Sequence, residues 1–442
     1  MSGETRRAVL LVAIGGMLLV LVPAGLAALL LADGASVPLF MTGICLAGAL
    51  WLGAVALVRY GALPHWMVWF VVGVAVAMRA MTLAAPPLLS TDVYRYVWDG
   101  RVQMAGINPY RYLPAAPELA SLRDDAVYPS INRAGYAPTV YPPAAEGVFA
   151  LAVAVAPGVF GMKLMMLGFD ALALVALAWL LRVAGRPAAE LLIFAWLPLP
   201  VWEFAGNAHV DAVTAGVLTL ALVVAAQGRA VWTGIMLAVA TLTKFLPAVV
   251  VPAFWRPRDW RLPFAFAVAV MVLYIPYLSV GWRVFGFLGG YVSEEGVQSG
   301  HGIFLLQLLG SAVTLPSWAG AAYIAGALAV VGALAARFAF SGTLPAAAGP
   351  RVLLIARQAA ILGAAVLVAV SPHYPWYFAW LAPLACLAPI PSILWMLAAA
   401  PLLAHGAVET LIVPGAVYIP AAALALRDLR RLPIPQPVIR SA

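Results

Sequence analysis

The sequence has little charge. Asp, Glu, Lys and Arg make up 10% of its 442 residues, whereas hydrophobic residues make up 65%. A soluble domain carries roughly 25% charged residues, so this composition excludes a soluble globular protein. Long apolar runs recur along the whole chain, without the alternation that is typical of an outer-membrane barrel. We therefore predict an all-α polytopic protein with about 12–14 membrane segments, surrounded by membrane lipids.

Cysteine and lysine are also scarce. Cys45 and Cys386 both lie in apolar runs, so neither a disulfide framework nor a cysteine-based metal site is expected. Lys163 and Lys244 are the only lysines in a chain of net charge +8, which is therefore carried by arginines. These arginines are scattered among short connections, so nucleic acid is not an expected partner. In a membrane protein such an excess mainly sets the orientation.

The arginines predict which ends of the spans are cytoplasmic. Arg6 and Arg7 precede the first apolar run and Arg59 follows the second, which assigns both of these ends to the cytoplasm. The first run passes Leu30 without a convincing cleavage site, so we expect an uncleaved span and not a signal peptide. This predicts a protein of the cytoplasmic (inner) membrane with both termini in the cytoplasm and its long polar loop on the extracytoplasmic, periplasmic face.

The apolar runs predict where the chain crosses the membrane. An apolar run at 144–157 is too short to span and is expected to be an interfacial helix. Residues 231–255 have basic residues at both ends and should form a broken hairpin with Lys244 near its apex. Spans are expected at about 8–31, 37–58, 65–84, 162–181, 188–204, 212–226, 262–280, 318–339 and 352–370, followed by three shorter apolar runs.

The longest polar stretch lies between the third span and the interfacial helix, at residues 90–143. It contains five acidic and five basic residues, so it is not simply a basic strip on a lipid surface. Gly, Pro, Asn, Tyr and Trp are interleaved with the charges, which is typical of an ordered loop. Long ordered loops usually carry function, and we expect the site here.

Two acidic residues of this loop are candidates for a general base. If the stretch is helical, Asp92, Arg95 and Asp99 share one face, because they are three and four residues apart. A carboxylate at the membrane surface suits proton abstraction from a hydroxyl, and the neighbouring arginines suit a phosphate. The same residues could instead form a network that only holds the loop in place.

Lys244 is the second candidate, because a lysine inside the membrane is costly and is by default a functional residue. A positive charge at the apex of a hairpin suits a lipid-linked phosphate. The alternative is a lysine that extends its amine to the membrane surface.

Other polar residues fall at predicted outer boundaries or within spans. His209 and Asp211 are two residues apart and give weak support for a metal site. His373 is followed by Trp376 and Tyr377, which suit an aromatic belt or the wall of a sugar or isoprenoid site. The loop residues Glu294, Glu295 and His301 are interpreted as solvated. His209, His301, His373 and His405 are all expected at the outer face. Some of four further charged residues should form structural ion pairs: Arg79, Asp170, Glu203 and Arg357.

Three motifs in the polar loop resemble a known superfamily. They are DVYRYVWDGRV at 92–102, GINPY at 106–110 and YPP at 141–143. With them the chain resembles the polytopic glycosyltransferases of the GT-C superfamily, closest to the polyprenyl-phosphate-mannose-dependent mannosyltransferases of family 87 and uncharacterised bacterial relatives. The resemblance covers residues 64–430, with the outer loop at 86–143. Residues 1–63 are then two additional spans, and residues 431–442 are a cytoplasmic tail.

The resemblance implies an inverting transfer of a hexose, with mannose as the first choice, from a polyprenyl-phosphate-sugar to a lipid or glycan acceptor on the extracytoplasmic face. Asp92 would be the general base, with Asp99 as the alternative, and Arg95, Arg101 and Lys244 would bind the donor phosphate. No cofactor and no metal ligands are expected, although a divalent metal is left open. The expected pocket residues are Tyr94, Trp98, Asn108, Tyr110, Tyr141, His209, Asp211, His373, Trp376 and Tyr377.

A lipid-linked sugar flippase is the main alternative to an enzyme, and a non-catalytic partner in envelope assembly is a third. A transporter should show polar residues at mid-membrane in two repeated halves. Here the polar residues concentrate in predicted outer loops and no repeat is apparent, which favours the enzyme.

Overall fold

The computed structural model describes residues 3–32, 37–61, 63–88, 90–296, 300, 302–405 and 411–430. Within these ranges the regular structure is helical, with no strand. The all-α polytopic fold predicted from composition is therefore confirmed.

In the part of the chain that the structure describes, six helices are long and apolar enough to cross a membrane, and a further pair is bent by 54° between Ala188–Ala195 and Pro198–Gly206. The predicted number of segments is reached only when shorter apolar helices are counted as well. These are α3 (Met67–Leu83), α5 (Pro143–Val155), α9 (Asp211–Ala226), α10 (Ala230–Thr241), α19 with η7 (Pro391–His405) and α20 (Ile412–Arg430). The six long helices are α1 (Gly3–Leu31), α2 (Val37–Tyr60), α6 (Val159–Val183), α12 with its 3-10 continuation η6 (Arg261–Phe285), α15 (Ala319–Ala339) and α16 (Ala348–Val370).

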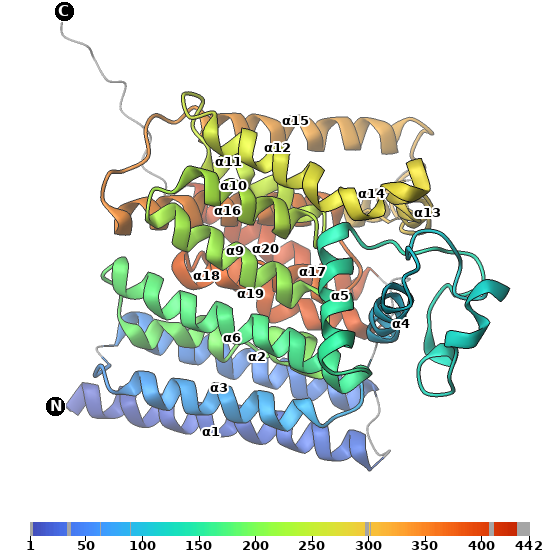
Figure 1. Ribbon diagram of the computed structural model, residues 1–442. Coiled ribbons are helices and arrows are strands. Elements are labelled where there is room, and N and C mark those ends of the chain that lie inside the picture. The colour runs from blue at the N-terminus through green and yellow to red at the C-terminus, as the bar shows by residue number, and fades with distance from the viewer. Residues whose placement is uncertain are drawn as a thin grey trace, which may run out of the picture.

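The helices lie roughly side by side in one bundle (Figure 1). In this view α1, α3 and α6 form its lower part, α12 and α15 its upper part, and α9, α16 and α18 (Ala382–Leu387) lie between them. The polar loop, α4 (Asp92–Met104) and α5 gather at the right end, together with α13 (Leu288–Glu294) and α14 (Phe304–Gly310). The N-terminus lies at the left end. The loop and the N-terminus are therefore at opposite ends of the bundle.

Two arginines join neighbouring segments at the end that lies opposite the polar loop. Arg59 donates a hydrogen bond to the Pro389 carbonyl at 3.0 Å, and Arg351 donates to the Ala226 carbonyl at 3.2 Å. These bonds join the end of α2 to the turn before α19, and the start of α16 to the end of α9. Arg59, which was used above to predict orientation, thus also holds together a connection at this end, as does Arg351.

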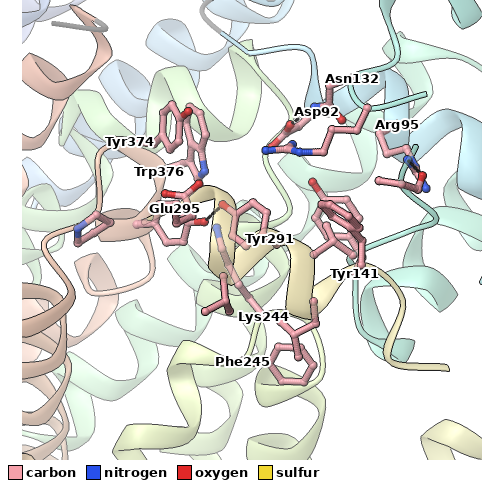
Figure 2. Close-up of a pocket in the computed structure, with 18 of the residues that line it drawn as sticks. Asp92, Arg95, Asn132, Tyr141, Lys244, Phe245, Tyr291, Glu295, Tyr374 and Trp376 are labelled. Atoms are coloured by element: carbon pink, nitrogen blue, oxygen red, sulfur yellow. Dashed lines mark hydrogen bonds between the residues drawn. The ribbon is translucent and has the colours of Figure 1, made fainter. Parts of the chain in front are cut away.

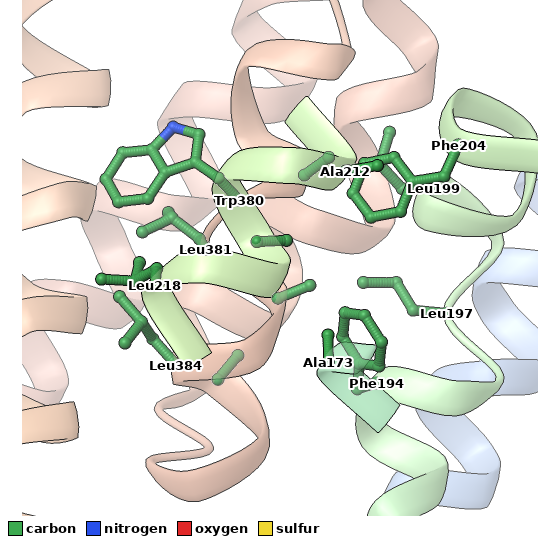
Figure 3. Close-up of a cluster of buried hydrophobic side chains, with 14 of the residues drawn as sticks. Ala173, Phe194, Leu197, Leu199, Phe204, Ala212, Leu218, Trp380, Leu381 and Leu384 are labelled. Atoms are coloured by element: carbon green, nitrogen blue, oxygen red, sulfur yellow. The ribbon is translucent and has the colours of Figure 1, made fainter. Parts of the chain in front are cut away.

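The bent segment 188–206 passes through the core of the bundle. It was expected to be one span, but Pro198 and Pro200 interrupt the helix because proline has no backbone N–H to donate. The large side chains Phe194, Leu197 and Phe204 of this segment are fully buried. Figure 3 shows Phe194 and Leu197 beside Ala173 of α6 and Phe204 beside Ala212 of α9, with Trp380, Leu381 and Leu384 on the other side of α9 beside Leu218.

A buried ion pair supports the break in this segment. Arg79 of α3 pairs with Asp170 of α6, and its guanidinium also donates to the Ala195 carbonyl at 2.7 Å. That carbonyl lies at the end of α7 (Leu192–Ala195), where the bend leaves it without a helical partner. Arg79 and Asp170 are therefore one of the structural ion pairs that the sequence predicts.

The predicted hairpin at 231–255 is broken where expected. Helix α10 ends at Thr241, and the chain becomes helical again at η5 (Leu246–Val250) and α11 (Val251–Phe254). Lys244 lies in the non-helical connection between them.

A close approach of two helices fixes the outer loop on the bundle. At Gly100, in the centre of α4, an added Cβ would lie 2.5 Å from the Phe149 carbonyl oxygen of α5. Any larger residue would force the helices apart. The glycine of the DVYRYVWDGRV motif thus has a packing role, holding α4 against the short apolar helix α5.

Candidate active site

A cavity of about 630 Å³ lies at the end of the bundle that carries the polar loop. Figure 2 shows Asp92 and Asn132 on one side of it, Lys244 and Phe245 on the other, and Tyr291 between them. The wall is built from the start of α4, the loop at 132–142, the hairpin break at 243–246, residues 287–295 and the segment 370–377. Five stretches that are far apart in sequence therefore meet around one space.

Asp92 is the acidic group of the polar loop that faces this space. It is the first residue of α4, where the positive end of the helix dipole stabilises a carboxylate. Its Oδ1 accepts a hydrogen bond of 2.7 Å from the Asn132 amide, and its side chain is 20% exposed. Its Oδ2 is 3.9 Å from Nε2 of the fully buried His209. One oxygen is thus fixed, while the carboxylate remains open to the cavity.

Lys244 lies on the opposite side and is already paired. Its Nζ donates to both oxygens of the buried Asp211, at 2.9 and 2.8 Å, and lies 4.1 Å from the centre of the Tyr377 ring. The hydroxyl of Tyr377 in turn bonds the hydroxyl of Tyr291. A cation and two aromatic rings therefore form one connected part of the wall, with the acid Asp211 behind it. Its lysine keeps 18% of its side chain exposed to the cavity.

Asp99 lies outside the wall of the cavity, although it shares a helix with Asp92. Nε of Arg95 donates to its two oxygens at 2.9 and 3.0 Å, and the two side chains are 5% and 2% exposed. Arg95 reaches the cavity wall, but it also donates to the Ala137 carbonyl at 3.2 Å. Its charge is thus largely satisfied within the loop.

A second carboxyl lies beside Asp99. Glu146 of α5 accepts hydrogen bonds from Thr139 at 2.6 Å and from Gln103 at 2.8 Å, and is fully buried. Burial raises the pKa of Glu146 well above its usual value, and the charge of Asp99 raises it further. Burial raises the pKa of Asp99 as well, with Arg95 acting against this. The two carboxyls therefore hold a proton at a pH where ordinary carboxyls have lost theirs.

Arg101, predicted to bind phosphate, lies outside the cavity wall. It is paired with Asp124 at 2.6 Å on the surface of the loop. Burial acts to raise the pKa of Asp124, but the hydrogen bonds from the Val127 N–H and from Arg101 outweigh it and lower this pKa. Arg101 follows Asp99 by two residues, about 200° of rotation in an α-helix, so its side chain points to the opposite side of α4.

The predicted pocket residues divide into two groups. Tyr141, His373, Trp376 and Tyr377 line the cavity. The others lie behind or beside the wall, because they hold the surrounding segments together: Trp98 packs against Tyr128, Asn108 donates to the Tyr277 carbonyl at 3.0 Å, and the Tyr110 hydroxyl donates to the Tyr141 carbonyl at 2.6 Å. The residues that the structure places outside the wall are Tyr94, Trp98, Asn108, Tyr110, His209 and Asp211.

Three wall residues, together with Glu294 beside them, were not found from the sequence or were misinterpreted there. Asn132 and Arg133 follow no recognised motif. Arg133 pairs with Glu294 at 2.7 Å and its guanidinium lies 5.3 Å from the centre of the Tyr291 ring. Glu294 and Glu295 were interpreted as solvated, yet Glu294 joins two loops through this pair and Glu295 lines the cavity. These contacts join residues about 160 positions apart, so no local signal predicts them.

The side chains of two of the four histidines predicted at the outer face lie within the described residues. His209 and His373 lie at the cavity end, and their place at the outer face stays a prediction; His301 and the side chain of His405 lie outside the described residues. Within the described ranges, no group of three or more His, Cys, Asp or Glu side chains could hold a metal ion. The involvement of a divalent metal therefore stays open.

Together, the fold and the cavity define an integral membrane protein with an active-site-like chamber of charged and aromatic residues at one end of its helices. The family model described as "alpha-(1→6)-mannopyranosyltransferase, N-terminal domain" (MptA_B family) matches residues 7–256, more than half of the chain, and the protein belongs to this family. It is therefore a mannosyltransferase of the GT-C type, as the loop motifs predict. Neither a curated protein nor a solved structure matches the chain.

The matched range begins before the predicted module. It includes α1 and α2, which the sequence interpretation set apart as two additional spans at 1–63. It also includes the whole stretch from the start of α4 at Asp92 to the hairpin break at Lys244. The boundary at residue 63 stays a prediction.

Proposed function

We propose that the protein transfers mannose from a polyprenyl-phosphate-mannose donor to a glycan hydroxyl with inversion at the anomeric carbon, and that Asp92 is the general base. The observation that carries this proposal is the position of Asp92. Among the acidic residues of the polar loop 90–143, it is the one whose carboxylate lines the cavity, held at one oxygen by Asn132. A carboxylate fixed in this way can take a proton from a hydroxyl bound in the cavity.

The family description supports an α-(1→6) linkage as the bond that is formed. An α-(1→6) linkage is made by a primary hydroxyl at C6 of the acceptor. In an inverting step this oxygen attacks C1 of the donor mannose, and the bond from C1 to the phosphate oxygen breaks with its electron pair leaving on polyprenyl phosphate. The hydroxyl proton passes to Asp92. Because inversion gives an α product, the donor would be a β-linked mannosyl phosphate.

The leaving phosphate needs positive charge on the far side of the sugar. Lys244 lies across the cavity from Asp92 (Figure 2), and Arg133 lies on the wall beside Asn132. Preorganised cations favour a phosphate that gains charge in the transition state. The paired state of Lys244 with Asp211 keeps the cation in place before the donor binds. Lys244 is therefore the first choice for the phosphate, ahead of Arg95 and Arg101.

The remaining walls suit the two ends of the substrates. Tyr374 and Trp376 are stacked at 4.6 Å and offer a flat face for a sugar ring. Phe245, Leu246 and Leu288 form an apolar part of the wall suited to the first isoprene units of the donor. The cavity thus combines a general base, a cation, an aromatic face for the sugar ring and an apolar wall for the isoprene units of the donor.

The arginine distribution supports an extracytoplasmic site. The cavity and the polar loop lie at the end of the bundle opposite the N-terminus (Figure 1), and Arg6 and Arg7, near the start of α1, lie at that opposite end. Positive residues favour the cytoplasmic side. We therefore assign the cavity to the periplasmic face of the inner membrane, where polyprenyl-linked sugars serve as donors.

The proposal is tested with the purified protein in liposomes, a mannose-ended oligosaccharide acceptor and either radiolabelled polyprenyl-phosphate-mannose or radiolabelled GDP-mannose. We expect product only from the lipid-linked donor, digestible by an α-(1→6)-mannosidase. Asp125→Asn, an exposed acid of the same loop, should keep the activity, and Asp92→Asn should lose it. Product from GDP-mannose alone would contradict the donor, and movement of lipid-linked mannose across the bilayer without product would favour a flippase.

A further inference from the structure

A buried histidine and glutamate lie directly behind Asp92. Nδ1 of His209 donates a hydrogen bond to Oε2 of Glu203 at 2.6 Å, and the two side chains are 0% and 7% exposed. Glu203 also accepts a bond of 3.1 Å from the Asn207 amide. In the chemistry proposed above Asp92 takes a proton, but neither of these two groups has a part in that step.

The backbone is shaped to bring this pair together. Glu203 lies in η4 (Val201–Gly206), a π-helical turn, a type of helix that is rare and frequent at functional sites. Ala208, between the turn and His209, has φ = 57°, a conformation that is unfavourable for a residue with a Cβ. The His209 N–H then donates to the Glu203 carbonyl at 2.7 Å. The chain thus doubles back and points the imidazole at the glutamate.

The hydrogen bonds fix which nitrogen of His209 is free. Because a carboxylate only accepts, Nδ1 carries the proton in its bond to Glu203. In the neutral ring Nε2 therefore keeps its lone pair, and it accepts a hydrogen bond of 3.1 Å from the Ser90 hydroxyl. The same Nε2 lies 3.9 Å from Oδ2 of Asp92. This is about 1 Å longer than a hydrogen bond, a gap of the size that closes when substrate binds.

The ring is held rigidly in this position. It stacks on Trp376 with ring centres 4.2 Å apart, and Trp376 in turn stacks on Tyr374 in the cavity wall. The charged groups in contact with His209 are Glu203 and Asp92. Asp211, two residues further along, is neutralised by Lys244. A protonated His209 would therefore lie between two carboxylates.

We infer that Glu203 and His209 form a buried relay that takes the proton from Asp92 during mannose transfer. This inference rests on the proposed function. The acceptor proton first moves to Oδ2 of Asp92. The O–H bond formed on Asp92 then breaks, and its electron pair stays on Asp92. The Nε2 lone pair of His209 takes the proton and forms a new N–H bond. The imidazolium is stabilised by Glu203, and Asp92 is a carboxylate again. After product release the proton returns through Asp92 to water. His209 and Glu203 are thus positioning residues that act through Asp92.

The test compares Glu203→Gln with Glu190→Gln in the full-length protein in liposomes. Glu190 is a matched control, because it is also buried in the bent segment but pairs with Arg186. We expect Glu203→Gln to lower kcat by about 10- to 100-fold, the loss seen when the outer partner of a metal-bound histidine is removed. The donor KM and the unfolding temperature should stay near those of Glu190→Gln, and Glu203→Asp should recover part of the rate. Unchanged kcat, or a loss explained by lower stability and higher KM together, would overturn the relay.

A second measurement does not depend on transfer activity. The chain has five histidines, so ¹⁵N-histidine NMR of the detergent-solubilised protein, assigned with His209→Gln, can report the ring nitrogen that carries the proton. We expect the Nδ1–H form at His209, and loss of this preference in Glu203→Gln. An Nε2–H form would overturn the relay even if the protein transfers mannose. If the Nδ1–H form is found but wild type makes no product from polyprenyl-phosphate-mannose, the donor assignment is contradicted and the pair is retained.

Discussion

The two aspartates of α4 show how environment decides what a carboxylate can do. Asp92 and Asp99 are seven residues apart on the same helix, and both were candidates for the general base. Asp92 lies at the helix N-terminus on the cavity wall, with one oxygen held by Asn132. Asp99 is buried, paired with Arg95 and beside Glu146. The first can reach a substrate, whereas the second stabilises the loop that carries the first.

The largest expected effect on stability comes from Asp99→Asn. Removing this carboxylate leaves the Arg95 guanidinium buried without its ion partner, which costs about 3–5 kcal/mol of unfolding free energy. Thermal unfolding in detergent should show a clear decrease, while the fraction that remains folded transfers mannose at nearly the wild-type rate. A fully stable but inactive Asp99→Asn would reverse the roles of the two aspartates.

A second test concerns Lys244, which lies across the cavity from Asp92. Lys244→Met alone would leave Asp211 buried and unpaired, so we combine it with Asp211→Asn. The double variant should fold but lose about 10²–10³-fold in kcat, because the leaving phosphate loses a preorganised cation. Steady-state kinetics with polyprenyl-phosphate-mannose provide the measurement, with Asp211→Asn alone as the control that keeps the lysine. Wild-type turnover in the double variant would assign the phosphate to another cation.

Glu146 tests whether the region around Asp99 holds a proton. A carboxyl whose pKa is raised in the folded state binds its proton more tightly there than when unfolded. The stability that it contributes is therefore full at low pH and is lost as pH rises through the raised pKa. The unfolding temperature should fall as pH increases above the ordinary range of carboxyls. Glu146→Gln should flatten this slope, and the exposed Glu118→Gln should not. Equal slopes in all three proteins would contradict the shared proton.

The smallest effect is expected at Arg101. Its pair with Asp124 is partly exposed, with side chains 22% and 40% accessible, so Arg101→Gln should change the unfolding free energy by no more than about 1 kcal/mol. Because Arg101 lies outside the cavity wall, the donor KM should also stay close to wild type. A large increase in donor KM would restore the phosphate-binding role that the sequence predicts.

The long-range features of the fold followed from the sequence because they depend on composition. Apolar runs predicted the spans, and the hairpin break at Lys244 was found because basic residues at both ends of the run assign both ends to the same side of the membrane. The bend at 188–206 was missed although Pro198 and Pro200 lie within it. Membrane helices often tolerate proline when a neighbour satisfies the freed backbone group, and the Arg79 contact that does so here joins residues 116 positions apart.

The candidate site could be predicted only where several site residues lie close together in one segment of the sequence. The loop motif located Asp92, and the segment at 371–377 supplied His373, Trp376 and Tyr377. Helical spacing did not show which of Asp92 and Asp99 faces the cavity. The position of the cavity relative to α4 is set by α5, α13 and the 370–377 segment. The pairing of Arg133 with Glu294 and the stacking of His209 on Trp376 depend on the same tertiary arrangement. No local pattern carries that information.

The most direct test of the central claim is a rapid-quench measurement of one turnover, made on folded Asp92→Asn and folded Asp99→Asn in the same lipid. The protein is in excess over radiolabelled polyprenyl-phosphate-mannose, so the rate reports bond formation and not product release. We predict a loss of about 10²–10⁴-fold for Asp92→Asn, the contribution of a general base, and a near-wild-type rate for Asp99→Asn. The reverse result would show that the buried carboxyl of α4, and not the one on the cavity wall, takes the proton.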